Sequence, residues 1–200
     1  MSQKVNPLEL YTIREATEAD LPQILDIYNE RVLNSTSLFV YDPVTLENRQ
    51  TWLKDCQAKG YPVIVAVEKE TNTVIAYSSL GQYRPHPAYV LTAEISIYIN
   101  INHHRRGLGR ILLEEMIAIA EKMKLRSLIA SITSENSPSI QLFGRYQFKQ
   151  AGQFHDVGYK FGRFLDVTFL ERILESTVVE FTGAASFTHF PWGQYRYGLE

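Results

Sequence analysis

Residues 94–123 constrain the fold more than any other part of the chain, because the hydrophobic pattern changes its period within them. From Glu94 to Ile99, isoleucines alternate with polar or aromatic residues, which is the period of a strand with one buried face. From Leu108 to Met123, apolar residues recur three and four positions apart, as on one face of a helix. The stretch therefore predicts a strand, a turn and a helix in direct succession.

The turn between this strand and this helix is rich in glycine and arginine. The first amides of a helix have no intrahelical acceptor, and the peptide dipoles add partial positive charge there, so a helix start attracts anions. Two glycines remove the Cβ atoms that would hold a pyrophosphate away from the backbone, and the arginines add charges that do not titrate. The sequence therefore predicts an anion-binding loop, with an ordinary strand-to-helix turn as the alternative. The residues of the predicted loop are Arg105, Arg106, Gly107, Leu108, Gly109 and Arg110.

Two other phosphate-binding loops do not fit this turn. The dinucleotide fingerprint requires a third glycine at position 112, where Leu112 stands. The loop of nucleoside-triphosphate-binding proteins requires a Gly-Lys-Ser/Thr sequence, which the chain lacks.

The rest of the chain alternates strand and helix patterns, so we expect a mixed α/β sheet with helices on both faces. A Thr17-Glu-Ala-Asp20 capping box predicts a helix start near Leu21. We divide the chain into an N-terminal extension (1–9), one domain (10–174) and an aromatic-rich tail (175–200), which either packs on its own domain or contacts another subunit. The expected strands are 10–14, 61–68, 74–81, 94–99, 127–132, 148–154 and 166–172, and the expected helices are 21–33, 45–60, 108–123 and 139–146.

Composition excludes several classes of protein. A formal net charge of -2 with mixed signs argues against nucleic acid or a membrane surface as the main partner. The single cysteine, Cys56, excludes an internal disulfide framework and a cysteine-rich metal site, and the five histidines have no ligand spacing, so we expect no metal. The first residues lack the apolar core of a signal peptide, and no apolar run is long enough to span a bilayer. We therefore expect a cytoplasmic protein.

Further short motifs accompany the turn along the chain. They are Ile13-Arg14, Ala16-Thr17 and Asp20; Thr92-Ala93-Glu94 and Ser96 to Ile99; Asn136 to Ile140; Leu142 to Phe148; Gly158-Tyr159-Lys160; and Leu165-Asp166-Val167. Together with the turn they resemble the GNAT acetyltransferase superfamily, and within it the phosphinothricin and methionine sulfone/sulfoximine N-acetyltransferases. The resemblance covers about Leu10 to Ile173 and leaves both ends of the chain unexplained.

This resemblance implies a centrally splayed sheet, acetyl-CoA as the acetyl donor and a homodimer. It places Glu94 in the position of the family's catalytic glutamate, which takes a proton from the amine. A solvated strand residue or a salt-bridge partner is the alternative for Glu94.

The family likeness also implies contacts for both substrates. The backbone of the splayed strand would face the cofactor through Ile97, Tyr98 and Ile99. Asn136 and Ser139 would bind the pantetheine arm, although residues at a helix entry also serve as caps. The amine pocket would include Phe39, Arg84 and Tyr159. Arg84 suits a substrate carboxylate because its planar guanidinium binds one bidentately, but on position alone an arginine here is more often a surface charge.

Two residues depart from the family pattern. His104 stands where the loop usually has Gln or Arg, a small loss because backbone amides carry most of the pyrophosphate contact. Phe143 stands where the superfamily often has a tyrosine and the phosphinothricin enzymes a histidine, near the leaving thiolate. Phenylalanine cannot move a proton, so the general acid must be Tyr159, another group or water.

These observations predict an acetyl-CoA-dependent N-acetyltransferase for a small amino-acid-like compound, with direct transfer in a ternary complex. Two alternatives remain open. In the first, the chain is an acetyltransferase whose amine is a polyamine, an aminoglycoside or a protein N-terminus. In the second, which Phe143 allows, the chain is a non-catalytic acyl-CoA-binding module.

Overall fold

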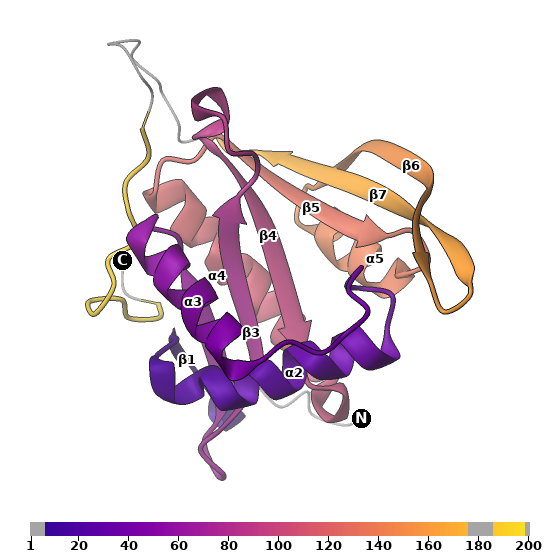
Figure 1. Cartoon of the computed structure of the whole chain (residues 1–200). Helices are drawn as coiled ribbons and strands as arrows, with labels where there is room; N and C mark the ends of the chain where they lie inside the picture. Colours follow the sequence, from indigo (N-terminus) through magenta and orange to yellow (C-terminus); the bar gives the residue numbers. More distant parts are fainter. Residues whose placement is uncertain (1–6, 176–185, 199–200) are drawn as a thin grey trace, which may run out of the picture.

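The computed structural model describes residues 7–175 and 186–198, in which a seven-stranded mixed sheet lies between two layers of helices (Figure 1). The strand order is β1-β2-β3-β4-β5-β7-β6. Only β4 and β5 run parallel, and every other neighbouring pair is antiparallel. The mixed α/β class expected from the sequence is confirmed. The strands are β1 (Tyr11–Glu15), β2 (Val63–Glu68), β3 (Thr73–Gln82), β4 (Thr92–Ile99), β5 (Ser127–Thr133), β6 (Lys149–Lys160) and β7 (Arg163–Ile173).

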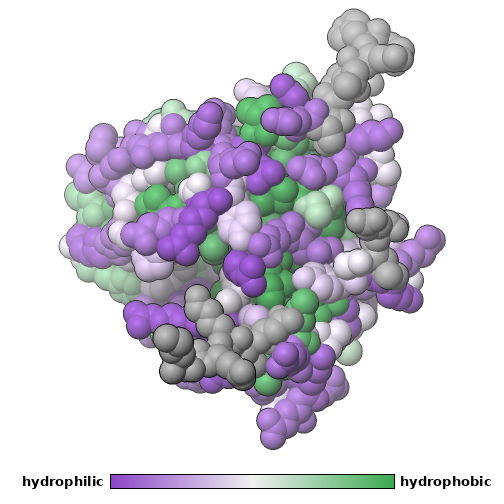
Figure 2. Space-filling model, turned by 180° about the vertical axis from the view of Figure 1, so that it is seen from behind, coloured by the Kyte–Doolittle hydropathy of each residue, from purple (hydrophilic) through white to green (hydrophobic). Residues whose placement is uncertain are grey.

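The described residues also contain five α-helices and three short 3-10 turns, of which α1 precedes the first strand. Helices α2 and α3 cover one face of the sheet, and α4 and α5 cover the other (Figure 1). On the α4 side, hydrophobic surface forms a band over the middle of the molecule between hydrophilic residues (Figure 2). The helices are α1 (Pro7–Leu10), α2 (Leu21–Asn34), α3 (Leu46–Ala58), α4 (Leu108–Lys122) and α5 (Ser137–Arg145), and the turns are η1 (Glu18–Asp20), η2 (Pro87–Tyr89) and η3 (Ile101–His103).

The first two long helices begin where their capping residues predict. Thr17 and Asp20 form a capping box, and the Asp20 carboxylate also accepts two hydrogen bonds from Arg14 at 2.6 and 2.7 Å. The Thr45 hydroxyl accepts a hydrogen bond from the Asn48 amide at 3.2 Å and caps α3. Gly60 ends the turn after α3. Its φ of +76° is a left-handed conformation that glycine adopts more easily than other residues.

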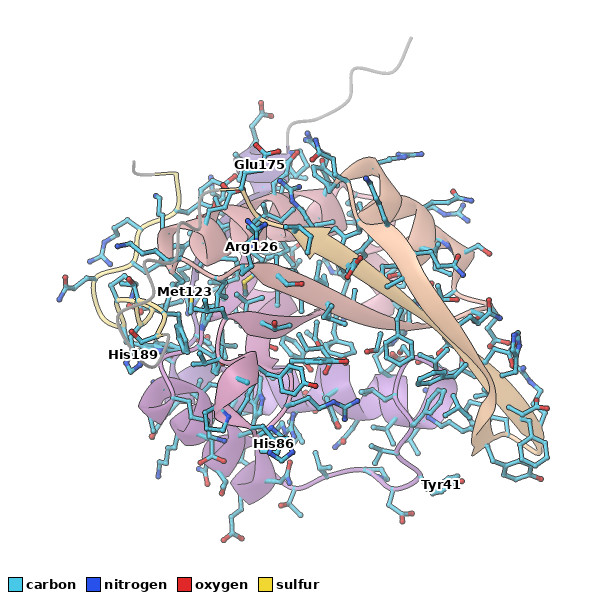
Figure 3. The ribbon with its side chains drawn as sticks, turned by 90° about the horizontal axis from the view of Figure 1, so that it is seen from above. Tyr41, His86, Met123, Arg126, Glu175 and His189 are labelled. Carbon is cyan, nitrogen blue, oxygen red and sulfur yellow. The ribbon has the colours of Figure 1, made fainter. Side chains whose placement is uncertain are left out.

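The described part of the C-terminal tail, residues 186–198, packs on its own domain. The ring of Phe187 stacks on Tyr61 with 5.0 Å between centroids, and the Phe190 amide donates to the Gly60 carbonyl at 2.9 Å. Figure 3 shows His189 of the tail beside Met123 at the end of α4. The rest of the tail, 176–185 and 199–200, lies outside the described residues, as do residues 1–6 of the predicted extension. The division into 1–9, 10–174 and 175–200 remains a prediction.

The last two strands are longer than the sequence pattern indicates. We expected 148–154 and 166–172, but β6 and β7 form a long hairpin that closes through Phe161 and Gly162, both with positive φ. The pattern failed here because most β6 side chains are exposed, so the strand lacks a regular alternation of buried and exposed residues. A register shift between Phe154 and Gly158 interrupts it further.

Within the described residues, no helix combines the length and the hydrophobicity that a membrane crossing requires.

Candidate active site

The centre of the sheet opens after Glu94. Strand β4 pairs with β3 from Ala93 to Ile99, but its parallel pairing with β5 covers only Thr92 to Glu94. Beyond this point β5 pairs only with β7, and the two central strands diverge (Figure 1). The edge of β4 that faces β5 therefore has no ladder partner beyond Glu94, which leaves backbone groups free to bind another molecule.

A cleft lies in this opening. It lies next to Phe143, which is buried and packs edge-on against Phe148 with 4.9 Å between ring centroids. Because a phenyl ring neither donates nor accepts a proton, this wall of the cleft is chemically inert. The lining residues are Ser37, Ile95, Ser96, Ile97, Tyr98, Ala130, Ser131, Ile132, Thr133, Asn136, Ser139 and Phe143.

The glycine- and arginine-rich loop presents free backbone amides. Among residues 7–175 and 186–198, the amides of Arg105 to Arg110 donate no hydrogen bond to a protein acceptor. The next amide, that of Ile111, donates to the Gly107 carbonyl at 3.3 Å. Gly107 caps α4 at φ +83°, and Arg105 also has a positive φ of +61°. Successive amides at a helix start in this conformation form a site for an anion.

The side chains of the loop surround this helix start. All three arginines are exposed. Arg106 donates to the Tyr11 hydroxyl at 3.3 Å, and Arg110 lies 3.6 Å from the Glu114 carboxylate. The Nε2 atom of His104 lies 3.1 Å from the Ile99 carbonyl, so the residue at the position usually held by Gln or Arg fastens the loop to the end of β4.

Gly109 has a packing role that the sequence did not reveal. A Cβ atom at this position would lie 3.1 Å from Leu142 and 3.5 Å from Ile99. The glycine therefore lets α4, α5 and β4 approach closely, independently of any ligand. For this reason a bulky substitution at Gly109 disturbs the core as well as the loop.

Glu94 lies at the point where the two central strands separate. Its side chain is on the sheet face of Ser96 and Tyr98, opposite α4, because Ala93 and Ile95 enter the α4-side core. The Ser131 hydroxyl donates to the Glu94 carboxylate at 2.5 Å. Sequence reasoning missed Ser131, because nothing local to β5 indicates which residue of β4 it faces.

Of the other predicted cofactor residues, Ile97, Tyr98, Asn136 and Ser139 line the same cleft, whereas Ile99 is not among its lining residues. The Asn136 side chain accepts a hydrogen bond from the Ser139 amide at 3.3 Å and caps α5, and both residues line the cleft. The two roles predicted for Asn136, as a helix cap and as a ligand contact, are therefore compatible. Burial raises the pKa of Tyr98 to about 12, so this lining residue remains a neutral hydrogen-bond donor near pH 7.

Two of the three predicted amine-pocket residues lie near each other. The Phe39 ring lies against Gly158, where an added Cβ would approach the ring to 2.1 Å. The carbonyl of the adjacent Tyr159 accepts a hydrogen bond from the Tyr41 hydroxyl at 2.7 Å. These contacts hold the loop after α2 against the β6–β7 hairpin.

Arg84 lies on a different loop, which follows β3. Its guanidinium is 5.0 Å from the centroid of the Tyr83 ring, the side chain is exposed, and it is not among the cleft-lining residues. His86 of the same loop and Tyr41 lie on the same side of the molecule in Figure 3. Among the described residues, no cluster of three or more His, Cys, Asp or Glu side chains suits a metal ion.

Comparison with known proteins supports one family for this architecture. The Acetyltransferase (GNAT) domain family matches residues 13–169. The chain is 41% identical over 166 residues to the L-methionine sulfoximine/L-methionine sulfone acetyltransferase of Pseudomonas aeruginosa, covering 83% of this chain and 96% of that one. It is 32% identical over 163 residues to the phosphinothricin N-acetyltransferase of Streptomyces coelicolor, covering 81% and 95%.

A solved structure gives the same result. The GNAT superfamily phosphinothricin acetyltransferase of Sinorhizobium meliloti in complex with acetyl-CoA superimposes with a TM-score of 0.81 at 31% identity, over 84% of this chain and 90% of that one. The chain belongs to the GNAT acetyltransferase family.

Proposed function

We propose that this protein transfers an acetyl group from acetyl-CoA to the amino group of a small amino-acid-like compound of the phosphinothricin, methionine sulfone or methionine sulfoximine type. One observation carries the proposal: the unpaired edge of β4 leads directly into a helix start whose amides, from Arg105 to Arg110, have no protein acceptor among the described residues. The substrate class is supported by the names of the relatives.

Acetyl-CoA fits the residues that surround this opening. The loop amides and the glycines suit its pyrophosphate, and the unpaired edge of β4 at Ile97, Tyr98 and Ile99 suits the amide-bearing pantetheine arm. Asn136 and Ser139 extend the contact from α5. Donors on this edge also suit the thioester oxygen, where negative charge develops during acyl transfer.

The amine must reach the thioester carbonyl without its extra proton. An ordinary ammonium group has a pKa of ~10 and is mostly protonated at neutral pH, so a base near the cleft is useful. Glu94 is our candidate because it lies where the strands separate and its carboxylate is oriented by Ser131. Transfer is direct, since the lone cysteine, Cys56, is buried and lies on α3.

The leaving thiolate requires a proton from a group other than Phe143. The Tyr146 hydroxyl, one helical turn further, donates to Glu114 at 2.6 Å and is therefore engaged with α4. Tyr98 lines the cleft, but burial raises its pKa to about 12 and makes it a weak proton donor, so Tyr159 and water remain the candidate acids.

Thiol release from acetyl-CoA tests the proposed function. The purified protein is incubated with acetyl-CoA and, in turn, methionine sulfone, phosphinothricin, spermidine, an aminoglycoside and a short peptide, with acetyl-CoA alone as the control. We expect the highest kcat/KM with methionine sulfone or phosphinothricin. Faster turnover of the other amines would contradict the substrate class, and tight acetyl-CoA binding without turnover of any amine would show a binding module instead.

We further propose that the protein acts in the cytoplasm as a homodimer. The buried thiol of Cys56 suits a reducing compartment, and acetyl-CoA is a cytoplasmic metabolite. The β6–β7 hairpin supplies an exposed apolar surface for a second copy.

A further inference from the structure

Lys160, at the end of β6, is a lysine whose ammonium group is buried and fully hydrogen-bonded. Only 3% of the residue is exposed. Its Nζ atom donates to the carbonyls of Val32, Ser35 and Leu38 at 2.6, 2.8 and 2.8 Å, which uses all three N–H donors of an ammonium. Among the described residues no carboxylate lies within ion-pair distance of Lys160, so the three carbonyl dipoles stabilise its charge.

These carbonyls belong to the end of α2 and to the segment that follows it, loop 35–41. The last carbonyls of a helix lack intrahelical partners and carry the negative end of the dipole, so a cation is favourable there. Because one ammonium binds carbonyls on both sides of the helix end, it fixes the direction in which the chain leaves α2. Burial lowers the pKa of Lys160, but its three hydrogen bonds satisfy carbonyls at the end of α2 and in the loop. Removing the ammonium group would leave these carbonyls without that donor.

Loop 35–41 borders the opening between β4 and β5. Ser37 lines the cleft, and the Thr133 hydroxyl of β5 donates to the Thr36 carbonyl at 2.5 Å. On the hairpin side, Phe39 lies against Gly158 and the Tyr41 hydroxyl binds the Tyr159 carbonyl. The loop therefore extends from the cleft to the hairpin, and the buried Lys160 ammonium group binds it where it leaves α2.

We propose that Lys160 is a positioning residue that holds loop 35–41 across the amine side of the cleft. The affinity for the amine substrate then depends on the Lys160 ammonium group, although Lys160 does not contact the substrate. This inference rests on the proposed function. The three hydrogen bonds of Lys160 reach only the end of α2 and the loop, and none reaches the 105–110 loop or α5.

Steady-state kinetics of Lys160→Met test the proposal. Methionine keeps most of the side-chain volume and removes the three donors. We expect the KM for the amine to rise about 10-fold or more while the KM for acetyl-CoA stays within about twofold. Lys149→Met is the matched control, because Lys149 is an exposed lysine at the other end of the same strand, and both KM values should stay unchanged.

Gly158→Ala tests the same loop without removing a charge. The new Cβ would displace the Phe39 ring, so we again expect a higher amine KM and an unchanged acetyl-CoA KM. If Lys160→Met does not fold, judged by far-UV circular dichroism, Gly158→Ala decides the question. An amine KM within about twofold of wild type in the folded variants, or an equal rise in both KM values, would overturn the proposal.

Hydrogen exchange separates this proposal from the proposed function. In the absence of substrates, amides of residues 35–41 should exchange about 10-fold faster in Lys160→Met than in wild type or Lys149→Met. Unchanged exchange would contradict a role of Lys160 in holding the loop, whatever the activity. A third outcome combines two results: the wild type turns over no amine, and residues 35–41 still exchange faster in Lys160→Met. This outcome would contradict the proposed function and the effect on KM, and would support only the role of Lys160 in holding the loop.

Discussion

At the residue scale, the proposed chemistry depends on Glu94 and on what surrounds it. The alternation of β4 predicts its place on the strand, and the family resemblance supplies its proposed role. Its partner Ser131 was not predictable, because the contact joins β4 to β5 across a parallel pair that ends beside it. Pairing registers between distant segments depend on the whole sheet rather than on local sequence.

The Glu94→Gln variant tests the proposed base. We expect kcat to fall about 100-fold, with the largest loss at the low-pH end of the profile, where the amine is hardest to deprotonate. The fold should persist, since an amide oxygen still accepts the Ser131 hydrogen bond. The measurement is the pH profile of kcat for the preferred amine.

Ser131→Ala is the companion variant to Glu94→Gln. It keeps the carboxylate and removes only its orienting hydrogen bond, so we expect a loss of about 10-fold or less. Equal kcat in wild type and Glu94→Gln across the profile would show that the base is another group or bulk solvent.

At the element scale, the β4–loop–α4 unit is the part that the sequence describes best. The expected strand 94–99 and helix 108–123 correspond to Thr92–Ile99 and Leu108–Lys122. Both elements bury a regular face, so their periodicity is visible in the sequence. The β6–β7 hairpin has no such face, and for this reason its length was underestimated.

The same hairpin offers the surface for the proposed homodimer. Phe161 and Phe164 are 56% and 62% exposed, and Phe154 and Val157 on β6 are also exposed. Phe161 has φ +53° in the closing turn, a conformation that costs free energy for a bulky residue. An exposed aromatic ring kept in such a position suits a contact with another chain.

Phe161→Asn tests this hairpin contact. Asparagine tolerates positive φ, so the turn should form while the aromatic contact is lost. Light scattering after gel filtration should give twice the chain mass for wild type and for the control Tyr89→Ser, which removes an exposed aromatic from another loop. The mass of Phe161→Asn should shift toward one chain. A wild-type mass of one chain would contradict the dimer, and a Phe161→Asn dimer would place its interface elsewhere.

At the scale of the whole molecule, the sequence alone predicts neither the opening at the centre of the sheet nor the place where the tail packs. The splayed centre follows from the family resemblance, since no local pattern shows that β4 and β5 separate after Glu94. The aromatic tail lies beyond the family match, which ends at residue 169, and its composition does not indicate the surface on which it packs. The Tyr195 hydroxyl donates to Glu115 on α4 at 2.7 Å, so the described tail adds to the α4 layer that follows the 105–110 loop.

A crystal structure with bound acetyl-CoA tests the central claim most directly. We predict pyrophosphate oxygens at about 2.7–3.2 Å from backbone amides within Arg105 to Arg110, and the pantetheine arm along the unpaired edge of β4 from Ile95 to Ile99. Acetyl-CoA bound at another surface, or a complex in which β4 and β5 pair along their full length, would contradict the account.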